Sequence, residues 1–190
     1  MRSGGPIGGI VLAGSRPRRF RRTSESAQEI EPALRAMAAS PLGPIVLVLP
    51  AIADQLVEEL DLRGADPVLA EPYVCQAALL ARGLAELDGA AAVVVALADG
   101  TLRTPDVVRR LLAARGRSAA VRASYLGRPA HPLLLEQELI ARLRDATGDR
   151  GARNVIASSN ALDVPCDDLV GDLGDELAGD LDALAAGPVA

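Results

Sequence analysis

Lysine and tryptophan are absent from this 190-residue sequence, and all 20 of its basic residues are arginine. Without lysine, no reaction of this chain can use a side-chain ammonium as nucleophile, Schiff-base former or phosphate clamp. One phenylalanine and two tyrosines leave little aromatic surface. Proteins that bind single-stranded nucleic acid stack bases on such surfaces, so this class is disfavoured. The core must therefore be built from aliphatic side chains.

The sequence also lacks long hydrophobic runs and a large excess of charge. Its net charge of −5 gives no general attraction to nucleic acid or to an anionic membrane. No run reaches the roughly 20 apolar residues of a membrane span, and the apolar run within residues 1–12 is too short for a signal peptide. We expect a cytoplasmic protein with neither nucleic acid nor membrane as a partner.

Cysteine is scarce as well. Cys75 and Cys166 lie far apart in the sequence, without the CxxC spacing of a metal or redox site. Two free thiols buried in the core are the simplest interpretation, and a disulfide or a metal site is the alternative.

Apolar residues make up 49% of the sequence and charged residues 24%, which is typical of a folded protein, and we expect one domain over residues 1–190. Short runs that are apolar on both faces alternate with segments of helical period, and this order predicts buried parallel strands between helices. The fold class is therefore α/β, with three α/β/α layers, a mostly parallel twisted sheet, and ligands at the carboxyl ends of the strands. The strands are expected at residues 8–12, 45–49 and 91–97, and the helices at 25–39, 52–60, 75–87 and 104–114.

The second half of the sequence is less regular. It predicts a strand at residues 118–124, a turn at 127–132, and a strand end with a helix at 133–144. A tight loop at 148–151 should lead into another helix, and a short strand should end at 163–165. The leucine spacing of residues 167–186 indicates an acidic helix or a fraying tail.

The first predicted strand opens into an arginine-rich segment, IVLAGSRPRRFRR, at residues 10–22. Its small residues let the backbone approach an anion, and Arg16, Arg18 and Arg19 supply bidentate donors, so the loop could bind phosphate. A solvated basic loop is the alternative. Neither GxGxxG nor GxxxxGK[ST] is present, which argues against a dinucleotide-binding fingerprint or a P-loop.

Acidic residues in two places could hold a divalent metal. Asp99 directly follows an apolar run, which places it at the carboxyl end of a predicted strand, where an exposed carboxylate can hold Mg2+. Asp172 and Asp175 could bring a second carboxylate to the same metal. The alternatives are a turn-forming or helix-capping role for Asp99 and a solvated helix face for the other two.

Two further segments carry polar groups. The single histidine, His131, lies in GRPAHPLLL without a catalytic partner at a recognisable spacing, and a structural turn is the simplest interpretation. The segment GDRGAR, residues 148–153, could contact a phosphate through Arg150 or Arg153. It could equally begin a helix that Asp149 caps.

Taken in order, these segments resemble the molybdenum-cofactor nucleotidyltransferases, the MobA/MocA-like group of the Rossmann-like, nucleotide-diphospho-sugar-transferase type of fold. The resemblance covers nearly the whole chain. VLAGSRPRRF is similar to the family's LA(A/G)GxSxRxGxxK, and VVVALADGTLRTPDVVRRLL is similar to an apolar strand followed by LADxPxxTPxxxxxL. AHPLLL and GDRGAR are similar to the GHPxLL and GDxGAR elements of its cytidylyl branch. The residues that match the first motif are Leu12, Ala13, Gly14, Arg16 and Arg19.

The resemblance implies transfer of a nucleoside monophosphate from a nucleoside triphosphate to a small phosphorylated acceptor, with release of pyrophosphate. CMP is the preferred group and molybdopterin the preferred acceptor, because the later motifs resemble the cytidylyl branch. Arg19 and Asp99 would be catalytic, and Asp99 and Asp172 would hold Mg2+. The implied nucleotide-binding residues are Leu12, Ala13, Gly14, Ser15, Arg16, Arg19 and Asp99.

The chain departs from the family pattern at positions that bind substrate. Ser24 stands where the family has its signature lysine, Thr101 replaces the proline of LADxP, and Gly174 occupies the place of the second aspartate in DxDTPxD. These departures motivate a second hypothesis, a non-catalytic relative that keeps the fold for nucleotide binding or as a partner in molybdoenzyme maturation. A simple α/β domain with accidental motif matches is the third. The sequence leaves open whether the protein is an enzyme.

Overall fold

The computed structural model describes residues 4–14, 23–72, 75–98, 100, 102, 104–146 and 148–169, without the side chains of 23–26 and 149. Within these ranges, seven strands form one sheet in the order β3-β2-β1-β4-β6-β5-β7. The strands are β1 (Ile7–Leu12), β2 (Ile45–Pro50), β3 (Asp66–Ala70), β4 (Ala92–Leu97), β5 (Ala120–Tyr125), β6 (Arg128–Glu136) and β7 (Leu162–Pro165).

Six of these strands run in one direction. β1 pairs in parallel with β2 and with β4, and β2 pairs in parallel with β3. β6 is antiparallel to both β4 and β5, whereas β7 is parallel to β5. The carboxyl ends of all strands except β6 therefore meet at one end of the sheet, called the carboxyl end below, and the opposite end is called the amino end. The predicted fold class is confirmed.

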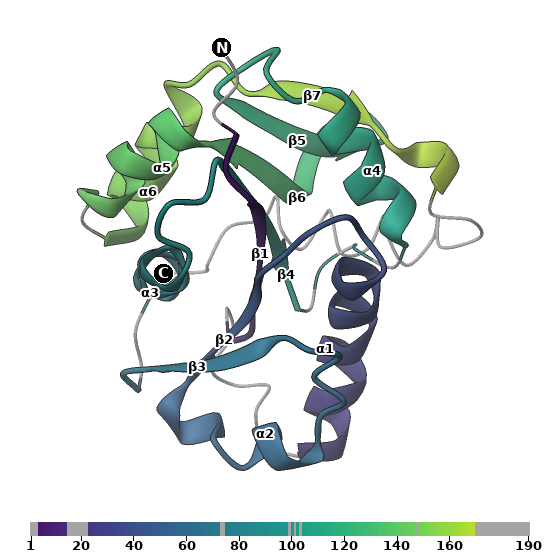
Figure 1. Cartoon of the computed structure of the whole chain (residues 1–190), viewed down its shortest axis with the longest axis vertical. Helices are drawn as coiled ribbons and strands as arrows, with labels where there is room; N and C mark the ends of the chain where they lie inside the picture. The colour runs from purple at the N-terminus through teal and green to yellow at the C-terminus, as the bar shows by residue number, and fades with distance from the viewer. Residues whose placement is uncertain are drawn as a thin grey trace.

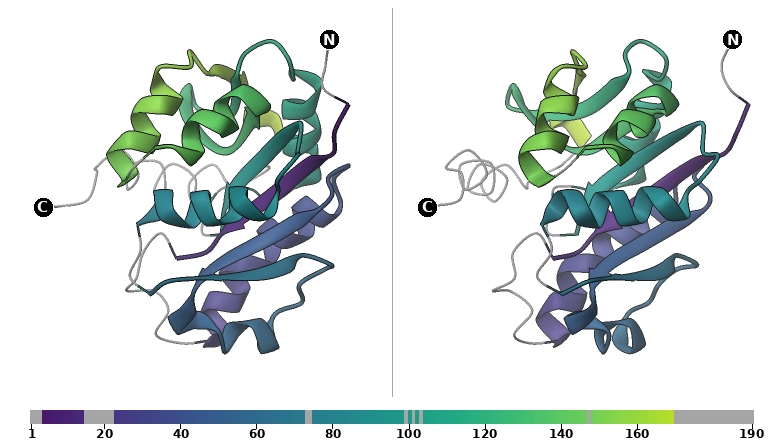
Figure 2. Two further views of the ribbon diagram at one scale, coloured as in Figure 1. Left: turned by 60° about the vertical axis from the view of Figure 1, so that its left-hand side comes forward. Right: turned by 90° about the vertical axis from the view of Figure 1, so that its left-hand side faces the viewer.

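Helices cover both faces of the sheet (Figures 1 and 2). One face packs against α1, α2 and α4, and the other packs against α3, α5 and α6. The helices are α1 (Thr23–Ala38), α2 (Leu56–Glu59), α3 (Gln76–Glu86), α4 (Pro105–Ala113), α5 (Gln137–Arg144) and α6 (Gly148–Ala157), with short 3₁₀ turns η1 (Ala51–Ala53) and η2 (Asp167–Leu169).

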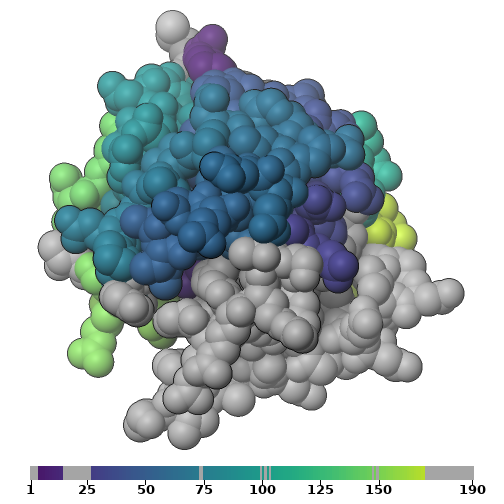
Figure 3. All heavy atoms as spheres, turned by 90° about the horizontal axis from the view of Figure 1, so that it is seen from below, coloured from purple at the N-terminus to yellow at the C-terminus, as the bar shows by residue number. Residues whose placement is uncertain are grey.

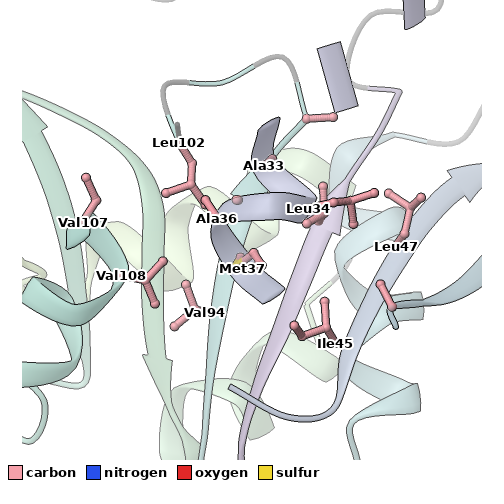
Figure 4. Packing of buried hydrophobic residues seen from close by; sticks show 14 of the residues in the cluster. Ala33, Leu34, Ala36, Met37, Ile45, Leu47, Val94, Leu102, Val107 and Val108 are labelled. Carbon is pink, nitrogen blue, oxygen red and sulfur yellow. The ribbon is translucent and has the colours of Figure 1, made fainter. Parts of the chain in front are cut away.

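The core is aliphatic apart from the buried Tyr125 of β5, much as the composition predicts. Ile30, Leu34 and Met37 of α1 recur at the spacing of one helix face, and all three are buried. Figure 4 shows Leu34 and Met37 among core side chains such as Leu47 of β2 and Val94 of β4. Full burial of an aliphatic side chain of this size contributes roughly 1.5–3 kcal/mol of transfer free energy, so such contacts fix the helices on the sheet.

The helix α3 lies close to the sheet because a glycine faces it. A Cβ added at Gly83 would come within 2.9 Å of Val48 Cγ2 and 3.1 Å of two atoms of the Ile10 side chain. Any larger residue would push α3 away from β1 and β2, since interiors are close-packed. Gly83 thus sets the height of α3, whose first turn stands at the carboxyl end of the sheet.

The helix expected over residues 52–60 is wrong. The chain instead makes the 3₁₀ turn η1 and then the single helical turn α2. The Asp54 amide donates to the Ala51 carbonyl and the Val57 amide to the Asp54 carbonyl, both i→i+3 bonds that interrupt the α-helical pattern. Leu56 and Leu60 are buried even so, which explains the helical spacing in the sequence.

The turn expected at residues 127–132 is wrong as well. Leu126 and Gly127 make the turn between β5 and β6 with φ values of 51° and 73°. Two residues with positive φ suffice for a tight hairpin, so the prolines that follow belong to β6. The loop expected at 148–151 is the first turn of α6.

No helix among the described residues is long and apolar enough to cross a membrane. Figure 3 views the side on which the outer strand β3 and the chain between β2 and β3 lie. Ile52 and Leu69 from this part of the chain are exposed by 47% and 44%. These are single exposed apolar residues of a kind common on protein surfaces.

Candidate functional site at the carboxyl end of the sheet

The chain leaves β1 and β4 side by side. Leu12 and Leu97 are register partners, and the Ala98 amide donates a hydrogen bond of 2.9 Å to the Leu12 carbonyl. The Ala13 amide donates a bond of the same length to the Val48 carbonyl of β2. The connections that follow β1 and β4 therefore start from neighbouring points at the carboxyl end of the sheet.

Gly14 turns the chain out of the sheet after β1. Its φ of 114° lies in a region that residues with a side chain rarely adopt, so a glycine is required here. Leu12 and Ala13 before it are buried, with their backbones held by neighbouring strands. Of the predicted nucleotide-binding residues, these three are the ones that the structure describes.

The other predicted site residues lie outside the described part of the chain: Ser15, Arg16, Arg19, Asp99 and Asp172. Their nearest described neighbours show where the segments that carry them begin. The segment that carries the arginines begins directly after Gly14, and Asp99 directly follows Ala98. The structure thus brings together the points at which two of the predicted segments begin.

The connection from β4 to α4 is short and anchored. The Gly100 amide donates to the Leu97 carbonyl at 3.1 Å, and Leu102 is buried in the core. Figure 4 shows Leu102 beside the α1 residues Ala33 and Ala36. Thr104 then caps α4 by accepting a hydrogen bond from the Asp106 amide, with proline at the first helical position, as the sequence predicts.

A second anchored turn, η2, follows β7 at the same end of the sheet. Both carboxylate oxygens of Asp168 accept hydrogen bonds from Arg110 of α4, at 2.5 and 2.8 Å. The Asp167 carboxylate accepts from the Leu126 amide at 2.5 Å. The hydrogen bond from Arg110 lowers the pKa of the Asp168 carboxyl, and the same bond raises the pKa of Arg110.

The pair Arg110 and Asp168 was not predicted from the sequence. Its members are 58 residues apart, and a single sequence does not reveal a contact at that separation. A partial signal was present, because the acidic pair at 167–168 begins two residues after the end of a predicted strand.

The prediction for the cysteines is half right. Both thiols are free, Cys166 is buried, and Cys75 is exposed at the N-cap of α3. The Cys166 thiol donates to the Val164 carbonyl at 3.4 Å, and burial raises its pKa. Cys75 escapes burial because it precedes the first turn of α3 rather than facing the sheet.

His131 lies within β6 and not in a turn. The segment GDRGAR begins the helix α6, on which Arg150 and Arg153 are exposed, but the helix starts at Gly148, so Asp149 lies within it and not at its N-cap as expected. Neither arginine makes a contact with the described part of the chain that would define a phosphate site.

Within the described ranges, no group of three or more His, Cys, Asp or Glu residues could hold a metal ion. A depression of about 480 Å³ lies at the amino end, between β3 and the end of α3, where its lining includes Asp66, Leu69, Arg82 and Glu86. It is remote from the strand ends at which this class of fold binds ligands.

Together, the parallel strands β1 to β4, the antiparallel β6 and the neighbouring ends of β1 and β4 define an α/β domain of the class that binds ligands at the carboxyl ends of its strands. A model of the MobA-like NTP transferase domain matches residues 9–164, and the chain therefore belongs to this family. No curated protein matches the sequence.

Solved structures share the fold at low sequence identity. Rv0371c from Mycobacterium tuberculosis H37Rv is 22% identical, with a TM-score of 0.75 over 96% of this chain and 98% of that one. The same protein in complex with manganese is 20% identical, with a TM-score of 0.71 over 94% and 99%. The 4-diphosphocytidyl-2C-methyl-D-erythritol synthase of Anaerococcus prevotii is 13% identical, with a TM-score of 0.66 over 97% and 98%.

Proposed function

We propose that this protein binds a nucleoside triphosphate with Mg2+ at the carboxyl end of its sheet and transfers the nucleoside monophosphate to a small phosphorylated acceptor. The observation that supports this most directly is the pairing of Leu12 with Leu97, from which the connections after β1 and β4 leave together. The first supplies Arg16 and Arg19, and the second supplies Asp99. A metal-bound triphosphate needs such cationic donors and a carboxylate in one place.

The donor set fits the metal. Mg2+ is commonly bound by one or two carboxylates, with phosphate oxygens and water as its other ligands, and Asp99 and Asp172 would supply two. When bound, the ion supplies neutralisation of charge on the phosphates. Residues 12–15 would hold the base and phosphates through the backbone, and Arg19 would contact the triphosphate.

In the proposed reaction, an oxygen of the acceptor's phosphate attacks the α-phosphorus of the nucleotide. The bond from that phosphorus to the bridging oxygen breaks, and pyrophosphate leaves. CTP is the preferred nucleotide and molybdopterin the preferred acceptor, because AHPLLL and GDRGAR resemble the cytidylyl branch of the family. The proposed location is the cytoplasm.

The absence of lysine supports a second candidate function. Ser24 takes the place of the family's signature lysine, and an arginine fork does not reproduce a compact ammonium. A chain without that phosphate contact could bind a nucleotide, or a molybdoenzyme during its maturation, without catalysing transfer. The two candidates share the nucleotide site and differ in turnover.

Calorimetric titration tests nucleotide binding, which both candidate functions share. CTP, GTP and ATP, each with Mg2+, should be compared on the wild type, on Asp99→Asn and on Asp106→Asn. Asp106 is a matched control, because it lies in the first turn of α4, just after the connection that carries Asp99, and pairs with Arg109 on the surface of that helix. We expect the wild type and Asp106→Asn to bind at least one nucleotide and Asp99→Asn to bind it at least tenfold more weakly. Heats no larger than those of dilution for all three nucleotides would end the proposal.

Pyrophosphate release separates the two candidates. With CTP and molybdopterin, the enzyme releases pyrophosphate and Asp99→Asn does not. Nucleotide binding without release from any of the three nucleotides would favour the non-catalytic relative.

A further inference from the structure

We draw no further inference here: the strongest candidate, the stretch of β6 around His131 at which the pairing with β5 shifts register, belongs to the site already described at the carboxyl end of the sheet, where most of the predicted binding residues lie outside the described part of the chain.

Discussion

Arg110, in α4, and Arg115, just after this helix, are close in the sequence but make ion pairs at opposite ends of the sheet. Arg115 binds the Glu136 carboxylate through Nε and Nη2 at 3.1 Å, and the Gly116 amide donates to the same carboxylate at 3.0 Å. The two side chains are 13% and 18% exposed. Arg110 binds Asp168 near the surface at the carboxyl end, where both partners are far more exposed.

The two ion pairs differ in burial, and this difference predicts how much each contributes to the free energy of unfolding. A mostly buried charge that loses its partner keeps its desolvation cost, so the Arg115–Glu136 pair should be needed for folding. Arg115 also donates to the Ala91 carbonyl just before β4, which ties the end of α4 to the start of the central strand. Removal of an exposed partner leaves a charge that water can solvate, so the Arg110–Asp168 pair at the carboxyl end should contribute little to the free energy of unfolding.

The largest expected effect on the free energy of unfolding is at the amino end of the sheet. Arg115→Met should lower the free energy of unfolding by about 2–4 kcal/mol, because the Glu136 carboxylate loses its cation while largely buried. Urea titration measures this. Arg82→Met is the matched control, because Arg82 pairs with Glu86 on the surface of α3, and its loss should be much smaller. Equal losses for the two variants would contradict the contrast in burial.

A smaller effect, dependent on pH, is expected at the carboxyl end. Arg110 holds the pKa of Asp168 below its ordinary value of about 3.9, so the pair's contribution is complete above that pH and is lost as the pH falls through the lowered value. Urea titrations of wild type and Asp168→Asn should show a constant small difference from pH 7 to pH 5 that shrinks below pH 4. A difference that grows in acid would show that the sign is wrong.

The smallest expected effect is on the rate at which the two thiols react. In the native protein, a thiol reagent should modify exposed Cys75 rapidly and buried Cys166 slowly, because burial raises the pKa of the Cys166 thiol and blocks access. Asp168→Asn should speed the slow reaction, since it loosens the turn that follows Cys166, and Arg82→Met should not. Mass spectrometry of the labelled chain reads both rates. Equally fast labelling of both thiols in the wild type would mean that this turn does not protect Cys166.

Local patterns predicted the elements that carry the site. The apolar run before Asp99 is β4, the run before Gly14 is β1, and Thr104 caps α4 as its sequence context indicates. The same patterns failed at residues 52–60 and 127–132, where a 3₁₀ turn and a two-residue hairpin replaced the expected elements. In both places the backbone conformation of a few residues overrode the side-chain pattern.

The sequence by itself determined the α/β class, the order of strands and helices, and the absence of lysine chemistry, because periodicity, turn residues and composition are local properties. Only the tertiary structure decided that β6 runs against its neighbours, that Leu12 lies beside Leu97, and which arginine meets which carboxylate. Those pairings join residues tens of positions apart, and their energies arise from burial and geometry, which exist only once the sheet has formed.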